Sequence, residues 1–244
     1  MNETLTTDKY WESLNRIEEK RTDILFSKIF QKYLKKENNQ ERNALEIGCV
    51  PGIYLAYISK TFGYFPEGID YVKNTKNITE KTLKNFGLNE SLIYEHDFTS
   101  WQTNNKYDLV CSFGFVEHFK DTDVIILKHI NLLKKGGQII IEFPNFSNGQ
   151  KIIHKLIDKK NLERHNTDIM NLDFFKKIAI TYNLEINFLG YYGGLFDFWW
   201  ENTNPSFVEQ LIKFILRCIT FITRRIPINN RFLSPYIILI ATNK

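Results

Sequence analysis

A short segment containing two glycines stands between a predicted strand, residues 44–47, and a predicted helix, residues 53–62. Glu46 precedes this segment, and Gly48, Cys49 and Gly52 lie within it. Glycine lets a backbone approach a ligand closely, and the N-terminus of the following helix offers N–H groups to an anion. The pattern lacks the three glycines of a dinucleotide loop, and no Gly-Lys-Ser/Thr triplet for a nucleoside triphosphate is present. A carboxylate here suits a ligand with an ammonium group; an ordinary turn is the alternative.

Acidic and aromatic residues follow the next two predicted strands. Asp70 ends the strand 66–70, where a carboxylate can bind a ribose diol, and Tyr71 beside it can stack on an adenine. Asp97 and Phe98 follow the strand 91–95, where they can contact an exocyclic amine and cover a base. Because open α/β sheets bind ligands at the carboxyl ends of their strands, we expect these residues to share one site.

The fourth predicted strand, residues 107–113, leads into a segment with a candidate base. Phe113 and Gly114 end the strand, and Glu117 and His118 follow. Histidine titrates near neutral pH, so His118 is the candidate general base. In the alternative interpretation, Glu117 and His118 only cap or orient the loop.

Two of the other four histidines are weaker candidates. His154 and His165 follow the fifth strand, in a region that can cover an acceptor, and each is interpreted either as an alternative base or as a packing residue. His96 and His129 are interpreted as structural. Cys49 lies in the glycine segment, but nothing indicates a nucleophile.

The elements that must position these residues alternate between strand and helix. The predicted strands are 44–47, 66–70, 91–95, 107–113, 138–143, 185–192 and 236–242, and the predicted helices are 8–36, 53–62, 73–86, 121–134, 172–182 and 206–225. Such alternation predicts βαβ units and a parallel sheet. We expect residues 1–42 to form an N-terminal helical cap and residues 43–244 one α/β domain, with an insertion at about 193–234.

In this order of motifs the chain resembles the class I S-adenosylmethionine-dependent methyltransferases of the small-molecule type. The likeness covers about residues 44–145. It rests on the segment from Glu46 to Gly52, Asp70 after the second strand, Asp97 with Phe98, the segment from Phe113 to His118, and the turn at Gly136 and Gly137. The resemblance implies a Rossmann-like, doubly wound, seven-stranded and mostly parallel sheet with an N-terminal helix and a late helical insertion.

The resemblance also implies S-adenosyl-L-methionine as cofactor and a role for each matching residue. Glu46 would orient the loop and reach the methionine ammonium. The backbone at Gly48, Cys49 and Gly52 would run close to the methionine portion of the cofactor. Further along, Asp70 and Tyr71 would hold the ribose and adenine, Asp97 and Phe98 the adenine, and Phe113 and Gly114 the sulfonium side.

Two residues depart from the family pattern. Val50 replaces the usual middle glycine, so we expect a looser or shifted cofactor contact there. Gly114 stands where quinone O-methyltransferases of this type carry an additional glutamate before Glu-His. We therefore expect no metal site.

Two aromatic segments can contribute to the site. Tyr10 and Trp11 can fold over the cleft, where an aromatic surface stabilises a sulfonium, or they can pack on a sheet edge. Residues 191–200 hold six aromatics around a diglycine, and they can wall an acceptor pocket or fill the core.

The predicted helix 206–225 is apolar except for a narrow polar stripe formed by Glu209, Lys213 and Arg217. A helix of this kind is buried, pairs with a partner or rests on lipid. Homodimer contact and peripheral membrane contact, the latter favoured by Arg224 and Arg225, both remain open.

The composition excludes several classes. With 43% hydrophobic residues, the 244-residue chain can bury a core, which excludes a disordered protein. The net charge of +4 is spread along the chain, so no nucleic-acid partner is expected. Three separated cysteines and a polar N-terminus indicate reduced thiols and a cytoplasmic location.

We interpret the chain as a methyltransferase that acts on a small-molecule, sugar or lipid-linked acceptor, with an oxygen as the expected acceptor atom. One alternative is a quinone or prenyl-aromatic O-methyltransferase, which the apolar helix favours. A cofactor-binding scaffold without turnover is the other.

Overall fold

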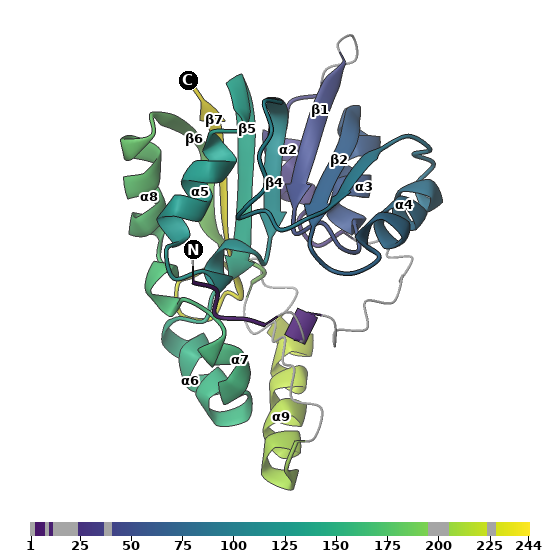
Figure 1. The fold of residues 1–244 in the computed structure, drawn as a ribbon. Coiled ribbons are helices and arrows are strands. Elements are labelled where there is room, and N and C mark those ends of the chain that lie inside the picture. The colour runs from purple at the N-terminus through teal and green to yellow at the C-terminus, as the bar shows by residue number, and fades with distance from the viewer. Residues whose placement is uncertain (1–2, 8–9, 12–23, 37–40, 195–204, 224–227) are drawn as a thin grey trace.

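The computed structural model describes residues 3–7, 10–11, 24–36, 41–194, 205–223 and 228–244. Its centre is a seven-stranded sheet in the order β3-β2-β1-β4-β5-β7-β6 (Figure 1). Strand β7 runs antiparallel to both of its neighbours, and the pairs from β3 to β5 are parallel. The predicted α/β, doubly wound, mostly parallel sheet is therefore confirmed.

The strands are β1 (Arg42–Ile47), β2 (Tyr64–Asp70), β3 (Leu92–Glu95), β4 (Tyr107–Phe113), β5 (Leu133–Pro144), β6 (Leu184–Tyr192) and β7 (Tyr236–Asn243). The helices are α2 (Ser27–Tyr33), α3 (Ile53–Phe62), α4 (Thr75–Asn85), α5 (Thr122–Ile130), α6 (Asn148–Ile157), α7 (Lys159–Glu163), α8 (Leu172–Thr181) and α9 (Phe207–Thr223). Two short 3-10 helices, η1 (Val116–His118) and η2 (Thr167–Ile169), complete the described elements.

Helices cover both faces of the sheet. Because successive side chains on a strand point to opposite faces, each strand contributes side chains to a core on either side. On β7, Ile237, Leu239 and Ala241 belong to the core cluster that includes α5 and α8. Ile238 and Ile240 belong to the cluster that includes α2, α3 and α4. Strands buried on both faces account for the nearly continuous apolar runs in the sequence.

The prediction of one helix over residues 8–36 is wrong at residues 24–26 and 34–36, whereas residues 10–11 and 27–33 are helical. Phe26 precedes the first turn of α2, and the helix ends at Tyr33, because the next residue, Leu34, is extended. Phe26 is buried among aromatic rings, including those of Phe113 and Tyr236 at 6.3 and 5.3 Å. This packing outweighs the local helical periodicity. Residues 8–9 and 12–23 lie outside the described residues.

The predicted helix 121–134 is too long. Helix α5 ends at Ile130, and β5 already begins at Leu133, which pairs with Tyr107 of β4. Lys134 also pairs with Asp108 of β4 at 2.8 Å. These contacts between strands pull residues 133–135 into the sheet. Helices α6 and α7 were not predicted.

The N-terminal segment, α6, α7 and α9 gather beyond the carboxyl ends of the parallel strands (Figure 1). Helix α9 (yellow-green) lies between β6 and β7 in the chain and extends away from the sheet. None of the described helices combines the length and the apolar character needed to cross a membrane. The boundary between an N-terminal cap at 1–42 and a domain at 43–244 stays a prediction.

Candidate active site

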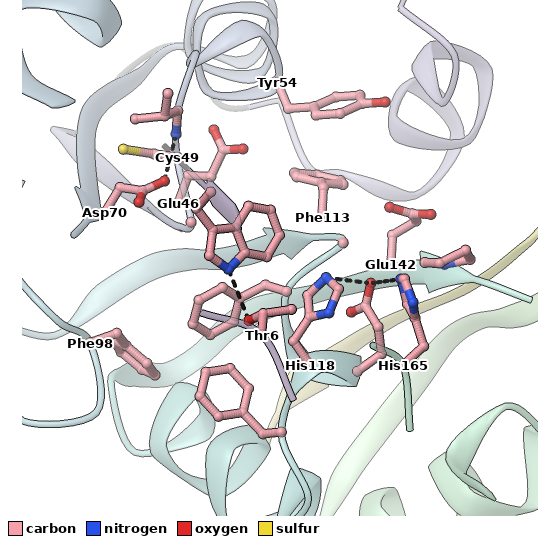
Figure 2. A pocket seen from close by; sticks show the side chains of 18 of the residues that line it. Thr6, Glu46, Cys49, Tyr54, Asp70, Phe98, Phe113, His118, Glu142 and His165 are labelled. Atoms are coloured by element: carbon pink, nitrogen blue, oxygen red, sulfur yellow. Dashed lines mark hydrogen bonds and ion pairs between the residues drawn. The ribbon is translucent and has the colours of Figure 1, made fainter. Parts of the chain in front are cut away.

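A cavity of about 920 Å³ lies at the carboxyl ends of β1, β2 and β4. The sequence-predicted cofactor and catalytic residues all line it. They are Glu46, Gly48, Cys49, Gly52, Asp70, Tyr71, Asp97, Phe98, Phe113, Gly114 and His118. In Figure 2, Asp70 and Phe98 lie at one side of the view, and His118, Glu142 and His165 lie at the other. The fold thus joins the ends of separate strands into one elongated site.

The loop after β1 requires glycine at two positions. Gly48 has a φ of +73°, and a β-carbon there would lie 2.8 Å from the Phe115 ring. Gly52 has a φ of +92° and a similarly close neighbour, a threonine methyl group. L-residues with side chains rarely adopt such φ values. Glu46 Oε2 accepts the N–H of Leu55 at 2.8 Å, which satisfies a donor at the start of α3. Loop and helix are held together by this carboxylate.

Asp70 ties the loop to the end of β2. Its carboxylate, 8% exposed, accepts the N–H groups of Val50 and Val72, each at 3.1 Å. Val50 is itself buried, so the residue that departs from the family pattern is held by its backbone. Burial, together with the Asp70 and Glu46 charges, raises the pKa of the Cys49 thiol well above its usual value. Cys49 is therefore a protonated packing residue of the loop.

At the end of the cavity next to β3, Asp97 and Phe98 differ in exposure. Asp97 is exposed and accepts the N–H and the hydroxyl of Thr99 at 2.8 and 2.7 Å. Phe98 is buried, with its ring edge-on to His129 at 5.0 Å. His129 packs beneath Phe98, in keeping with a structural role. His96, which was also interpreted as structural, lines the cavity.

Three buried groups meet at the other end of the cavity. Glu117 Oε1 lies 3.7 Å from His118 Nε2 and 4.0 Å from His165 Nε2, as the dashed lines in Figure 2 mark. His118 Nδ1 is 2.9 Å from the Arg164 carbonyl, and His165 Nδ1 is 2.7 Å from the Asn161 carbonyl. A carbonyl can only accept, so both Nδ1 atoms carry a proton. In each neutral ring the lone pair is then on Nε2, the atom that faces Glu117.

Burial controls the ionisation of this cluster. Glu117 is 0% exposed, and desolvation raises the pKa of its carboxyl to about 8. Desolvation, followed by the neighbouring His118, lowers the pKa of His165 well below its usual value. Burial therefore favours the neutral forms of the Glu117 carboxyl and the His165 imidazole.

The N-terminal segment covers the cluster from the solvent side. The Trp11 ring lies edge-on to His118 at 4.9 Å, and its Nε1 donates to Thr6 Oγ1 at 2.9 Å. Trp11 also lines the cavity. The Tyr10 ring contacts the Arg164 guanidinium at 4.2 Å instead. Of the predicted aromatic pair, only Trp11 reaches the site.

Several cavity residues were not predicted. They are Tyr54, on which Phe113 stacks at 4.2 Å, Glu142 and Tyr236. His154, an alternative base in the sequence analysis, lines the same cavity. Glu142 lies near the carboxyl end of β5, so the rule used for the other strand ends could have found it. Burial and the Glu117 charge raise the pKa of Glu142 well above its usual value. For Tyr54 the sequence held no comparable signal.

The aromatic segment 191–200 is only partly described. Tyr191 and Tyr192 belong to β6, and the Tyr192 ring lies 5.7 Å from that of Phe26. Residues 195–200, with the other aromatics of this segment, lie outside the described residues, as do Arg224 and Arg225.

Comparison with known proteins gives one family and many similar folds. Residues 17–187 match the family described as "Methyltransferase domain". No curated protein matches the chain.

Three solved structures illustrate the shared fold. A SAM-dependent methyltransferase from Thiobacillus denitrificans, in complex with S-adenosyl-L-homocysteine, is 14% identical, with 96% of each chain covered and a TM-score of 0.62. Geranyl diphosphate C-methyltransferase from Streptomyces coelicolor is 10% identical, with 89% of this chain and 78% of that chain covered and a TM-score of 0.58. Magnesium protoporphyrin IX methyltransferase from Synechocystis is 13% identical, with 85% and 76% covered and a TM-score of 0.53.

Proposed function

Since the chain belongs to the methyltransferase domain family, we propose that it transfers the methyl group of S-adenosyl-L-methionine to a small-molecule, sugar or lipid-linked acceptor. The acceptor atom in this proposal is an oxygen. One observation carries it: a single cavity collects Glu46, Asp70 and Asp97 from separate strand ends, beside a loop that requires glycine. The Thiobacillus and Streptomyces neighbours, both in complex with S-adenosyl-L-homocysteine, support the choice of cofactor.

The cavity offers suitable groups to the methionine, ribose and adenine portions of this cofactor. Gly48 and Gly52 line the cavity, and their positive φ values shape the turn along which the methionine portion would lie. Asp70 lies where ribose hydroxyls bind in sheets of this type, and Asp97 and Phe98 offer a carboxylate and a ring to an adenine. S-adenosyl-L-methionine, when bound, supplies an electrophilic methyl group on a sulfonium.

The residues of the chain orient the acceptor and receive its proton. His118 Nε2 takes the proton that an acceptor hydroxyl loses as its oxygen bonds to the methyl carbon. The Arg164 carbonyl holds the imidazole in the tautomer that this role needs. Trp11 shields the imidazole from water. Holding the acceptor in line with the methyl group accounts for a large part of the rate enhancement.

Calorimetry with S-adenosyl-L-homocysteine tests the cofactor assignment. We expect this ligand to bind and NAD and ATP to give no heat. For turnover, labelled cofactor is incubated with protein and a cell metabolite extract, and the products that gain one methyl group are identified by mass spectrometry. Binding of NAD without S-adenosyl-L-homocysteine refutes the proposal. Cofactor binding without turnover on any acceptor favours the scaffold alternative.

His118→Ala tests the proton-accepting role. We expect turnover to fall by about 10²–10⁴-fold, the usual effect of losing a general base, with little change in cofactor affinity. Weaker cofactor binding with a modest change in turnover would instead support a purely orienting role.

Among these acceptors we favour a lipid-linked one, because the end of the molecule that holds α6 and α9 has an apolar surface. On α9, Phe207, Phe214 and Phe221 are 80%, 64% and 66% exposed, and on α6 Ile152 and Leu156 are each 64% exposed. The two helices contact each other, and α6 also lines the cavity. This arrangement would place the cavity beside a membrane that holds the acceptor.

We favour an anionic membrane surface over a second copy of the chain as the partner of α9. Lys155, Lys159 and Lys160 are exposed on α6 and α7, and basic residues beside apolar ones favour anionic lipid. Co-sedimentation with vesicles of phosphatidylcholine alone, or mixed with phosphatidylglycerol, tests this choice. We expect binding to the mixed vesicles and its loss in Phe214→Glu. A concentration-dependent dimer that Phe214→Glu dissociates would assign the face to self-association.

A cytoplasmic location and the absence of a nucleic-acid partner complete the proposal. They are supported by the three cysteines, which are all free thiols, and by the even spread of charge along the chain.

A further inference from the structure

We propose that Glu117, His118 and His165 form a binding site for a divalent transition-metal cation of the zinc type. One carboxylate and two imidazoles offer one ligand atom each, and these atoms all lie within 4.8 Å of one another. No ligand set was expected here, because Gly114 stands where the related quinone enzymes carry a glutamate. In this chain the third ligand comes from a later segment instead.

The separations between ligand atoms are close to those of a bound cation. With bonds of about 2.1 Å, ligand atoms around a tetrahedral Zn²⁺ lie about 3.4 Å apart. The Glu117 Oε1 atom is 3.7 Å from His118 Nε2 and 4.0 Å from His165 Nε2. The ligand atoms as a set spread over up to 4.8 Å, so side-chain rotations toward the centre must shorten these separations when a cation binds. All three residues line the cavity, so a fourth coordination position would be available to a ligand in it, as in zinc sites that bind an exogenous ligand.

Both histidines are oriented as metal ligands usually are. Metal-binding histidines typically donate their other ring N–H to a carbonyl or carboxylate, which fixes the tautomer and the ring orientation. His118 donates to the Arg164 carbonyl and His165 to the Asn161 carbonyl. The nitrogens directed toward Glu117 are therefore the ones with lone pairs.

The carboxyl group of Glu117 is an independent indication that a cation binds here. It is fully buried, and neither of its oxygens has a hydrogen-bond partner among the described residues. Leaving a buried polar group unsatisfied costs about 1–3 kcal/mol, and more for a charged group. A cation between this carboxylate and the two imidazoles removes that cost.

Backbone and side-chain hydrogen bonds hold the two segments together before any cation binds. The Asn166 N–H donates to the Glu117 carbonyl at 2.7 Å. The Asn166 side-chain amide donates to the carbonyls of Phe119 and Lys120 at 3.3 and 3.2 Å. His165 is thereby fixed beside η1 although it lies 47 residues after His118. The ligand set is preorganised, which lowers the entropic cost of binding.

The ligand types select the class of cation. Imidazole suits Zn²⁺, Co²⁺ and related ions, whereas Mg²⁺ and Ca²⁺ prefer sets of oxygen ligands. The cation places positive charge at the acceptor end of the cavity, where it can bind an acceptor oxygen. Because His118 Nε2 is then a ligand, the proton-accepting role proposed above applies to the cation-free protein.

Direct metal titration tests the site without relying on activity. Untagged full-length protein is stripped with a chelator, dialysed and titrated with Zn²⁺ by calorimetry, with Mg²⁺ in parallel. We expect one Zn²⁺ per chain and no Mg²⁺ binding at the same concentrations. Titration with Co²⁺ should produce the visible absorption bands of a low-symmetry site. Wild-type protein that binds no stoichiometric Zn²⁺ overturns the proposal without the need for any variant.

Two variants and a matched control locate the site. Glu117→Gln and His165→Gln should each lower Zn²⁺ affinity by at least about 100-fold, because even outer-shell changes cost about 10–100-fold. His129→Gln is the control, since His129 is also buried and its Nδ1 bonds the carbonyl four residues earlier at 2.8 Å. Circular dichroism checks that each variant folds. Unchanged Zn²⁺ affinity in folded His165→Gln refutes the assignment.

Titration of the same samples with S-adenosyl-L-homocysteine separates this inference from the proposed function. Zn²⁺ binding without binding of this ligand would sustain the metal site and remove the proposed cofactor. The reverse result would remove the metal site alone.

Discussion

Asp70→Asn probes the proposed cofactor site with an almost unchanged side-chain shape. The Asp70 carboxylate accepts the backbone N–H groups of Val50 and Val72, each at 3.1 Å. A carboxylate can accept about four hydrogen bonds, so ribose hydroxyls can join these two donors. The asparagine amide keeps one oxygen and turns an NH₂ group toward the other backbone donor.

The expected loss follows from these contacts. A hydrogen bond to a charged group contributes about 1.5–3 kcal/mol, so losing one lowers the free energy of unfolding by about that amount. Loss of the charged acceptor for the ribose costs a similar amount in binding, which corresponds to about 10–150-fold weaker S-adenosyl-L-homocysteine affinity. Urea denaturation measures the first quantity and calorimetry the second.

Asp108→Asn is the matched control. Asp108 accepts the N–H of Asn43 at 3.0 Å and pairs with Lys134 at 2.8 Å, near the start of β4 and away from the cavity. The Asp108→Asn variant should have a lower free energy of unfolding but should bind S-adenosyl-L-homocysteine with the affinity of the wild type. An Asp70→Asn protein that binds S-adenosyl-L-homocysteine as tightly as the wild type would refute our placement of the ribose.

Three further predictions concern the loop, the core and the thiols. Gly48→Ala should lower the free energy of unfolding by about 1–2 kcal/mol or more and weaken cofactor binding, because the φ of +73° disfavours L-residues and a β-carbon would meet a ring at 2.8 Å. Burial lowers the pKa of His129 to about 4 from 6.5, so the unfolded chain gains a proton as the pH falls through this window while the folded chain does not. Stability present above pH 6.5 should therefore fall by about 3 kcal/mol toward pH 4, and urea titrations of His129→Phe should show a smaller fall. Iodoacetamide at neutral pH should label the exposed Cys218 in the native protein. It should spare Cys49 and Cys111, because both thiols are buried and burial raises their pKa values. Peptide mapping measures the labelling, and label at Cys49 would contradict the loop geometry.

Local patterns in the sequence were enough to predict the sheet and to group the residues that line one part of the cavity. Helix α3 and strand β4 have the predicted bounds, because apolar periodicity and flanking glycines are local signals. The residues after β1, β2 and β3 share a cavity because carboxyl ends of parallel strands meet at one edge. Glu46, Asp70 and Asp97 could therefore be grouped from the amino-acid sequence alone.

Only the tertiary structure decided where elements end and which distant groups meet. Residues 24–26 leave the helical conformation because Phe26 packs among rings from other elements, and residues 133–135 join β5 because they bond to β4. His165 reaches Glu117 through a turn held by Asn166, 49 residues away in the chain. Periodicity reports on neighbours within a few residues, whereas burial, ionisation and contact across such a distance depend on how the whole chain packs.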